Sequence, residues 1–278
     1  MTVITSPSNP RISKLQTLHT PRGRKKNGLF LIEGLNLLEV LLNARLFPVE
    51  VYYQPALLER TARGKVLLER LLHTAEVAQG LVEVSERVLE AVSDVQTTQG
   101  VVSVLPLNAF ESQRIRARRV AKLRPALLVL DDLADPGNMG TILRTALAAD
   151  VDTVLLTPAC VDYLSPKVVR AAAGAHVGLP VEANLPWDTI AEKIALHCGG
   201  VPRVLLAEAH SEHLYYNEDL ASPFVLVIGN EAHGPSQEAH KRATQIITIP
   251  LVNNVESLNA AMATGIILYE AVRQLRST

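Results

Sequence analysis

The 278 residues allow two ordinary domains, and 48% apolar side chains, 20% charged side chains and a net charge of −1 are typical of a globular protein. No apolar run approaches the ~18 residues that cross a membrane, and residues 1–26 lack the apolar stretch of a secretory signal. Cys160 and Cys198 are too few for a disulfide framework and form no CxxC pair, so we expect buried thiols, no metal site and a cytoplasmic protein.

The first hundred residues predict a small α/β domain, because short β-rich runs alternate with helical patterns. The expected strands are Leu29–Ile32, Val49–Tyr53, Leu81–Val84 and Val101–Leu105. The expected helices include Leu35–Ala44 and Leu57–Leu72. Residues 110–124 then indicate an exposed helix or linker, in which basic side chains recur every four residues on one face. We therefore place the first domain at residues 1–109 and a basic linker at 110–124.

From residue 125 the apolar runs are nearly unbroken, as expected for strands of a parallel sheet that is covered on both faces. The expected strands are Ala126–Leu130, Thr153–Thr157, Val204–Ala207, Phe224–Ile228 and Ile246–Ile249. Helical patterns lie at Met139–Ala149, Trp187–His197 and Ser257–Leu275. Residues 125–278 therefore predict a second α/β domain.

The positive charge of this nearly neutral chain is clustered. Residues 1–26 and residues 113–130 carry basic side chains and no acidic one. The basic residues are Arg11, Lys14, Arg22, Arg24, Lys25 and Lys26 in the first stretch, and Arg114, Arg116, Arg118, Arg119, Lys122 and Arg124 in the second. A solvated surface or a basic linker would explain either cluster alone. Two clusters that bracket one domain favour binding to a phosphate backbone.

Polar turn residues follow the first expected strand of the second domain, and open α/β sheets bind ligands at such strand ends. Asp135-Pro136-Gly137 predicts a turn, and Asn138 is a suitable N-cap for the next helix. Gly140 allows a ligand or another backbone to approach closely. Arg144 lies six residues after Asn138, in a neighbouring turn, and we expect both to face one pocket. The alternative is an ordinary capped helix with a surface arginine.

Two further strand ends carry similar chemistry. Gly229-Asn230-Glu231-Ala232-His233-Gly234 forms a compact loop in which we expect Glu231 to pair with Arg144. His233 is a candidate acid or base, but it has no predicted partner and is left out of the site. After Ile246–Ile249, a polar loop leads into a helix that opens with Ser257 and Asn259, for which simple capping is the alternative.

Together the three segments resemble the three motifs of the SpoU family, also called the TrmH family, of RNA 2′-O-ribose methyltransferases. The resemblance is carried by Asn138-x-Gly140-x3-Arg144, Gly229-x-Glu231-x2-Gly234 and Ile249-Pro250-x6-Ser257-Leu258-Asn259, in the order and spacing of the family. Ser8-Asn9-Pro10, the basic run and residues 29–34 look like the substrate-binding domain that precedes the catalytic domain in many members. That domain resembles a small RNA-binding ribosomal protein.

The resemblance implies a parallel-sheet domain whose C-terminal part threads into a deep trefoil knot, and it implies a homodimer. It also implies that S-adenosylmethionine is bound in a bent shape by the knotted loops. The sequence offers no cluster of metal ligands, and methyl transfer from a sulfonium does not require a metal. The implied cofactor-binding residues are Leu206, Ala207, Glu208, Gly229, Ile249, Leu251 and Leu258. The implied catalytic residues are Asn138, Arg144, Glu231, Ser257 and Asn259.

Methylation of a ribose hydroxyl requires its oxygen, the methyl carbon and the sulfur in line, and a route for the proton. The family nominates Arg144 to activate the hydroxyl, yet a guanidinium with a pKa above ~12 is a poor general base. Gripping an RNA phosphate and stabilising the developing alkoxide is a sounder role for Arg144. The asparagines and Ser257 then orient Arg144, substrate and cofactor, while Glu231 braces its loop.

The first domain favours ribosomal RNA as the substrate, and transfer RNA is the alternative; a 2′-hydroxyl target excludes DNA. A non-catalytic RNA-binding protein of the same fold predicts a broken motif, whereas all three motifs are intact. A doubly wound nucleotide-dependent enzyme is disfavoured because no GxGxxG follows the strand Ala126–Leu130.

Overall fold

The computed structural model describes residues 3–95, 97–110, 126–198, 203–253 and 255–277. The chain divides into two compact units, Met1–Phe110 with Leu164–Val177, and Glu111–Tyr163 with Gly178–Thr278. Apart from Phe110, the predicted basic linker lies outside the described residues, as do the basic side chains of the second cluster. None of the described helices is both long enough and apolar enough to span a bilayer.

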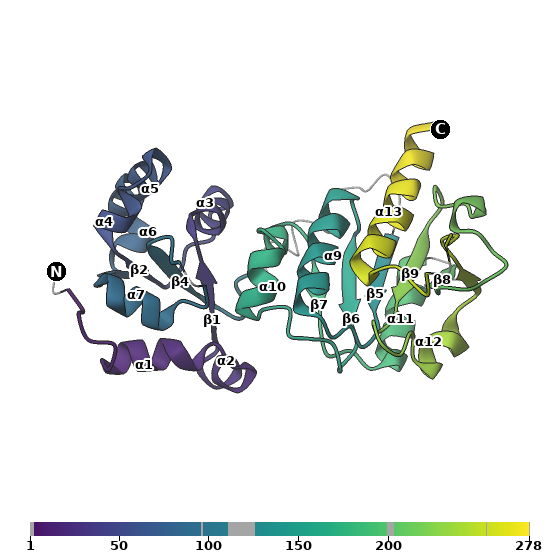
Figure 1. Ribbon diagram of the computed structural model, residues 1–278, viewed down its shortest axis with the longest axis horizontal. Helices are drawn as coiled ribbons and strands as arrows, with labels where there is room; N and C mark the ends of the chain where they lie inside the picture. Colours follow the sequence, from purple (N-terminus) through teal and green to yellow (C-terminus); the bar gives the residue numbers. More distant parts are fainter. Residues whose placement is uncertain (1–2, 96, 111–125, 199–202, 254, 278) are drawn as a thin grey trace. The chain divides into compact units, whose positions relative to one another are not determined.

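The first unit is a mixed four-stranded sheet between helices (Figure 1). Its elements are α1 (Pro10–Thr17), α2 (Pro21–Asn27), β1 (Leu29–Glu33), α3 (Leu35–Asn43), β2 (Glu50–Tyr53), α4 (Pro55–Leu58), α5 (Ala62–His73), α6 (Ala75–Ala78), β3 (Leu81–Glu83), α7 (Glu86–Val92), β4 (Val101–Pro106), α10 (Pro166–Ala171) and the 3-10 turn η1 (Ala175–Val177). The strand order is β1-β4-β2-β3. β4 is antiparallel to β1 and β2, and β2 is parallel to β3.

Side-chain alternation along β2 divides the first unit into two apolar cores. Tyr52 packs with buried residues of α1 and α7 on one face of the sheet. Val51 and Tyr53 pack with residues of α3 and α5 on the other face. Because successive strand residues point to opposite faces, a strand that is buried on both sides must be apolar at every position, as these three residues are.

The predicted helix Leu57–Leu72 is wrong as a single element. The structure has the separate helices α4 and α5, and the side chain of Thr61 caps the second by accepting a hydrogen bond from the Gly64 N–H. A β-carbon on Gly64 would lie 2.0 Å from the Leu58 carbonyl oxygen. The Thr61 cap and the closely packed Gly64 therefore divide the predicted helix into two, although its apolar residues have continuous helical spacing.

Residues 164–177 pack with the first unit, although the sequence assigned them to the second domain. The Arg170 guanidinium donates to the Asp94 carboxylate at 2.9 Å. The His176 ring stacks on the buried Phe110 ring, with centroids 5.7 Å apart. No periodicity in the sequence separates this segment from its neighbours, because Asp94 and Phe110 lie 76 and 66 positions before their partners Arg170 and His176.

The second unit is a six-stranded sheet in which every ladder is parallel. Its elements are β5 (Ala126–Leu130), α9 (Pro136–Ala148), β6 (Thr153–Leu156), β7 (Val181–Glu182), α11 (Trp187–Cys198), β8 (Val204–Ala207), the 3-10 turn η2 (Tyr215–Asn217), β9 (Phe224–Ile228), α12 (Gln237–Arg242), β10 (Gln245–Ile247) and α13 (Ala260–Ser277). All five strands predicted for this half are present. The edge strand β7 was not predicted, because two residues carry no usable pattern.

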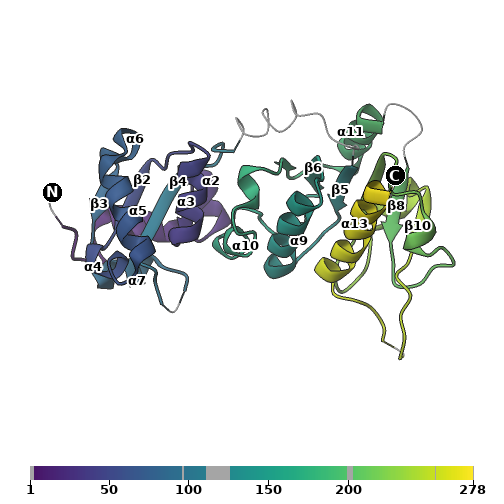
Figure 2. The same ribbon diagram turned by 90° about the horizontal axis from the view of Figure 1, so that it is seen from above.

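The strand order β10-β8-β9-β5-β6-β7 determines where the second unit can bind a ligand. α11 and α12 cover one face of the sheet, and α9 and α13 lie side by side on the other (Figures 1 and 2). From β5 the chain runs to β6 and β7, and it then returns to the other side of β5 through β8 and β9. Such a reversal opens a crevice at the carboxyl ends of the strands.

Candidate active site

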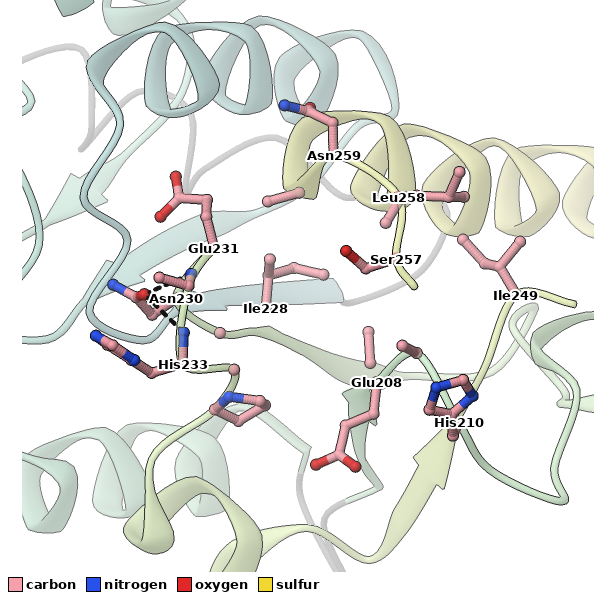
Figure 3. Close-up of a pocket in the computed structure, with 18 of the residues that line it drawn as sticks. Glu208, His210, Ile228, Asn230, Glu231, His233, Ile249, Ser257, Leu258 and Asn259 are labelled. Atoms are coloured by element: carbon pink, nitrogen blue, oxygen red, sulfur yellow. Dashed lines mark hydrogen bonds between the residues drawn. The ribbon is translucent and has the colours of Figure 1, made fainter. Parts of the chain in front are cut away.

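A cavity of about 680 Å³ opens at the carboxyl ends of β8, β9 and β10, a volume typical of small-molecule sites (Figure 3). It is lined by predicted site residues that include members of all three motifs. These residues are Asn138, Ala207, Glu208, Gly229, Glu231, Ile249, Leu251, Ser257, Leu258 and Asn259. Figure 3 shows Glu231 and Asn259 on one side of the cavity, and Glu208 and His210 on the other.

Hydrogen bonds join the three motif loops at one end of this cavity. The Asn138 side-chain amide donates to Glu231 Oε1 at 2.9 Å, and its carbonyl oxygen accepts from Asn259 Nδ2 at 2.8 Å. Glu231 also accepts from the backbone N–H groups of Ala134 at 3.1 Å and Asp135 at 3.1 Å. Asn138 is thus the centre of a chain that connects the segments after β5, β9 and β10.

The expected Glu231–Arg144 pair is absent from the described structure, because the Glu231 carboxylate is occupied by Asn138 and two backbone amides. Arg144 is exposed on α9 and does not line the cavity. Six residues along an α-helix amount to about 600°, which turns Arg144 roughly 120° away from Asn138. The expectation that both face one pocket within a single chain is therefore wrong.

Capping also differs from the prediction at two helices. Asp135, rather than Asn138, caps α9, and its Oδ1 accepts from the Asn138 N–H at 2.7 Å. Asn259 caps α13 by accepting from the N–H groups of Ala261 and Met262, so the helix begins at Ala260 instead of Ser257. The cap thereby fixes Asn259 where its amide nitrogen reaches Asn138.

The loop after β9 is held in shape by Asn230. Its side-chain oxygen accepts from the N–H groups of Ala232 and His233, and its Nδ2 donates to the Asp132 carbonyl at 2.7 Å. Gly229 begins the loop where no side chain fits, because a β-carbon there would lie 2.3 Å from the Pro235 nitrogen. Asn230 was not predicted as a site residue, although an asparagine directly after a strand is a usable turn signal.

Partial burial raises the pKa of the Glu231 carboxyl, but hydrogen bonds from Asn138 and from nearby backbone amides outweigh this effect and leave the pKa below its usual value. The ionised carboxylate is therefore the form that holds the loops together.

Glu231→Gln is expected to destabilise the second unit by about 1 kcal/mol at neutral pH. The carboxylate accepts hydrogen bonds at both oxygens, whereas the glutamine amide would turn its own N–H₂ group toward one of these donors. Since the pKa of Glu231 is lowered by folding, its contribution is present above the usual carboxyl pKa and is lost as the pH falls through the lowered value. Urea unfolding of Glu231→Gln across this acidic range measures the effect. Glu212→Gln, at an exposed carboxylate for which the described structure records no partner, is the control; equal stability of both variants at neutral pH would contradict the bracing role.

The wall of the cavity opposite Asn138 comes from the end of β8 and from α12. Ala207 and Glu208 line it, whereas Leu206 is fully buried in the core and does not. His240 of α12 also lines it and pairs with Glu208, a contact that was not predicted. These two residues are 32 positions apart, and no local pattern connects them.

Residues 125–269 match the family model described as the SpoU rRNA Methylase family. The chain belongs to this family. Residues 9–103 match a model described as an MRM3-like substrate binding domain. The family resemblance inferred from the three motifs is thereby confirmed.

Relatives of this SpoU family member match it over nearly its whole length. A Synechocystis protein described as an uncharacterized tRNA/rRNA methyltransferase, slr1673, is 35% identical over 98% of this chain and 93% of its own. The 23S rRNA (guanosine(2553)-2′-O)-methyltransferase RlmP of Bacillus subtilis is 30% identical over 97% of this chain and 98% of its own. The SpoU methyltransferase AviRb of Streptomyces viridochromogenes, crystallised with AdoMet, has a TM-score of 0.80 at 26% identity, covering 97% of this chain and 100% of that one. The mixed α/β fold with a parallel-sheet domain is confirmed by this likeness.

Proposed function

We propose that this SpoU family protein transfers a methyl group from S-adenosylmethionine to a ribose 2′-hydroxyl of RNA, with ribosomal RNA as the substrate. The observation that carries the proposal is the hydrogen-bonded chain Glu231–Asn138–Asn259, which joins the three family motifs at the edge of one cavity. The 23S rRNA 2′-O-methyltransferase RlmP matches 97% of this chain and 98% of its own, which supports the choice of ribosomal RNA. Transfer RNA is the alternative substrate.

The cavity suits this cofactor in size and in lining. Ile249, Leu251 and Leu258 supply apolar contacts for an adenine ring, while Glu208 and the backbone at Gly229 supply polar ones. When bound, S-adenosylmethionine supplies an electrophilic methyl group on a positively charged sulfur. Among the described residues, no three His, Cys, Asp or Glu side chains gather as a metal site would require.

The RNA that accepts the methyl group is positioned by four residues, Asn138, Ser257, Asn259 and Arg144. The Ser257 hydroxyl points into the cavity (Figure 3). Asn138 and Asn259 are locked together and therefore present fixed dipoles to the ribose. Arg144 is exposed and has no recorded partner in the described structure, so its guanidinium can grip an RNA phosphate beside the target ribose.

We assign RNA binding to residues 1–109, catalysis to residues 125–278, and the connection to residues 110–124. Four exposed basic side chains of α1 and α2, namely Lys14, Arg22, Lys25 and Lys26, support this assignment, as does the match to a substrate-binding domain. Arg24 is different. It is 2% exposed and donates to the carbonyls of Leu18 and His19, so it stabilises the fold instead of meeting RNA.

We also propose the trefoil knot that the family resemblance implies and the cytoplasmic location that the sequence predicts. The chain after β10 approaches the loops after β5 and β9 closely enough for Asn259 to bond to Asn138, as threading of the C-terminal segment requires. Cys160 is a free thiol, which fits a reducing compartment.

The proposed homodimer forms through α9 and α13. Met262 and Tyr269 are 60% and 51% exposed on α13, two turns apart, and Leu147 of the adjacent α9 is 40% exposed. Met262→Asp is expected to shift the protein toward monomers, because it places a charge in an apolar contact. Light scattering during size-exclusion chromatography measures the mass. Leu196→Asp changes an 85% exposed side chain of α11 on the opposite face and is expected to leave the mass unaltered; a monomeric parent protein would contradict the dimer.

The function is tested by mapping 2′-O-methylation in ribosomal and transfer RNA from cells with and without the protein. Loss of one or a few ribosomal sites is expected, with recovery when the protein is restored. Loss confined to transfer RNA would favour the alternative substrate, and an unaltered map of both RNAs would favour a non-catalytic RNA-binding protein.

A further inference from the structure

A histidine and a carboxylate are paired on the cavity wall opposite the Asn138 chain. His240 Nε2 lies 2.5 Å from Glu208 Oε1, and both residues line the cavity. Glu208 follows β8 and His240 lies on α12, two elements that pack against each other. The side chains of Glu208 and His240 are 25% and 43% exposed, so the pair lies at the wall of the cavity and not in the core.

Both ring nitrogens of His240 face oxygen atoms that accept hydrogen bonds. Nδ1 lies 2.8 Å from the Ser236 carbonyl oxygen, which can only accept. Nε2 faces the Glu208 carboxylate, which likewise accepts when ionised. A neutral imidazole has one N–H and satisfies only one of these contacts, whereas an imidazolium satisfies both. The geometry therefore selects the protonated ring.

The charges around His240 also favour the protonated ring. The Ser236 carbonyl raises the pKa of the His240 imidazolium, partial burial opposes this, and the Glu208 and Asp131 carboxylates raise it further. From α11, Asp188 instead pairs with Arg242 at 2.6 Å, so neither of these charges is left to act alone on His240. The net effect is a pKa above the usual histidine value.

We propose that protonated His240 is a positioning residue that holds the Glu208 carboxylate at the cavity wall as an acceptor for S-adenosylmethionine, so that cofactor binding weakens as the pH rises. The proposal rests on the assignment of this cavity to the cofactor. The cofactor offers two ribose hydroxyls and an ammonium group as donors, and one Glu208 oxygen is bonded to His240, which leaves Oε2 for them. Loss of the ring proton removes the positive charge beside Glu208 and leaves one N–H for two acceptor oxygens, which weakens the hold on the carboxylate.

The direction of the pH dependence follows from the raised pKa of His240. The pair stabilises the wall below the usual histidine pKa, and its contribution is lost as the pH rises through the raised value. Because the pair is partly exposed, solvent screens it, and the loss of its positioning effect is expected to weaken cofactor affinity about fivefold.

The test is isothermal titration calorimetry of the full chain with S-adenosylmethionine between about pH 5.5 and 8.5, which spans the usual histidine pKa. Wild-type protein is expected to lose affinity across this range. His240→Gln, whose amide still donates to Glu208 but does not titrate, is expected to lose the part of the pH dependence that His240 contributes, while His210 and His233, which also line the cavity, stay in place. Glu208→Gln is expected to bind weakly throughout. His213→Gln, at an exposed histidine of the same unit outside the cavity, is the matched control and is expected to follow the wild type.

S-Adenosylhomocysteine separates positioning from simple charge attraction, because it shares the hydroxyls and the ammonium group but lacks the positive sulfur. Parallel loss of affinity for both ligands is expected. A shift confined to S-adenosylmethionine, or a wild-type profile identical to that of His240→Gln, would overturn the role of His240. NMR titration of the His240 ring supplies a readout without ligand, in which Glu208→Gln is expected to lower the pKa of His240, and an unaltered pKa would also overturn it. Wild-type protein that binds neither ligand would instead overturn the assignment of the cavity to the cofactor.

Discussion

Arg144→Ala is expected to lower the rate of methyl transfer by about 10² to 10³, while the affinity for S-adenosylmethionine stays within about twofold of the wild type. The two effects separate because Arg144 is exposed on α9 and lies outside the cavity that we assign to the cofactor. In the proposed mechanism Arg144 binds an RNA phosphate and stabilises the developing alkoxide, so its removal affects only the steps that involve RNA. Single-turnover methylation of RNA and calorimetry with the cofactor measure the two quantities on the same preparations.

Two further variants sharpen this test. Arg144→Lys keeps the positive charge but loses the planar, two-pronged donor, so a partial recovery is expected if the guanidinium binds phosphate. Arg276→Ala removes another exposed arginine from the same unit and is expected to methylate at the wild-type rate. If Arg144→Ala methylates normally, Arg144 is not a catalytic residue. If cofactor affinity falls as far as the rate, its role lies in cofactor binding.

Gly229→Ala is expected to weaken cofactor binding at least a hundredfold, which corresponds to about 3 kcal/mol. The added β-carbon would lie 2.3 Å from the Pro235 nitrogen and 2.6 Å from the Gly234 carbonyl carbon, and both of these are backbone atoms. Backbone cannot rotate away as a flexible side chain can, so the loop 229–235 must move, and that loop forms one wall of the cavity. Calorimetry with S-adenosylmethionine measures the loss.

Gly265→Ala is the matched control for this substitution. It lies within α13, where a β-carbon would meet only the Thr145 methyl carbon at an ordinary 3.8 Å. Alanine in a helix is favoured over glycine by about 0.5–1 kcal/mol, so this variant is expected to melt slightly higher and to bind the cofactor normally. Wild-type affinity in Gly229→Ala would show that the loop moves freely and does not shape the cofactor site.

The strands of the second unit were predictable because a strand of a covered parallel sheet is apolar along its whole length. Phe224–Ile228 and Ala126–Leu130 are buried at every residue and have the bounds predicted for them. Elements that depend on distant partners were not predictable to the same degree. The edge strand β7 exists because Val181 and Glu182 pair with β6, and residues 164–177 join the first unit through contacts with Asp94 and Phe110.

The candidate active site likewise combines features that are local in the sequence with contacts between distant segments. The sequence by itself determined that Asn138, Glu231 and Asn259 follow three strands of one parallel sheet, and such positions converge at one edge. Only the tertiary structure decided their partners. Glu231 reaches Asn138 across 93 positions, and Asn259 reaches it across 121.

The sequence did not predict which side chains bond to each other, because these contacts depend on the rotation of each helix and on the path of each loop. A helix turns about 100° per residue, so Arg144 and Asn138, close in sequence, face different directions. His240 and Glu208 meet because α12 packs beside the end of β8, and nothing in either local segment records the other. Strand ends and turn chemistry are local properties of the chain, whereas the contacts that make this site are set by packing between distant segments.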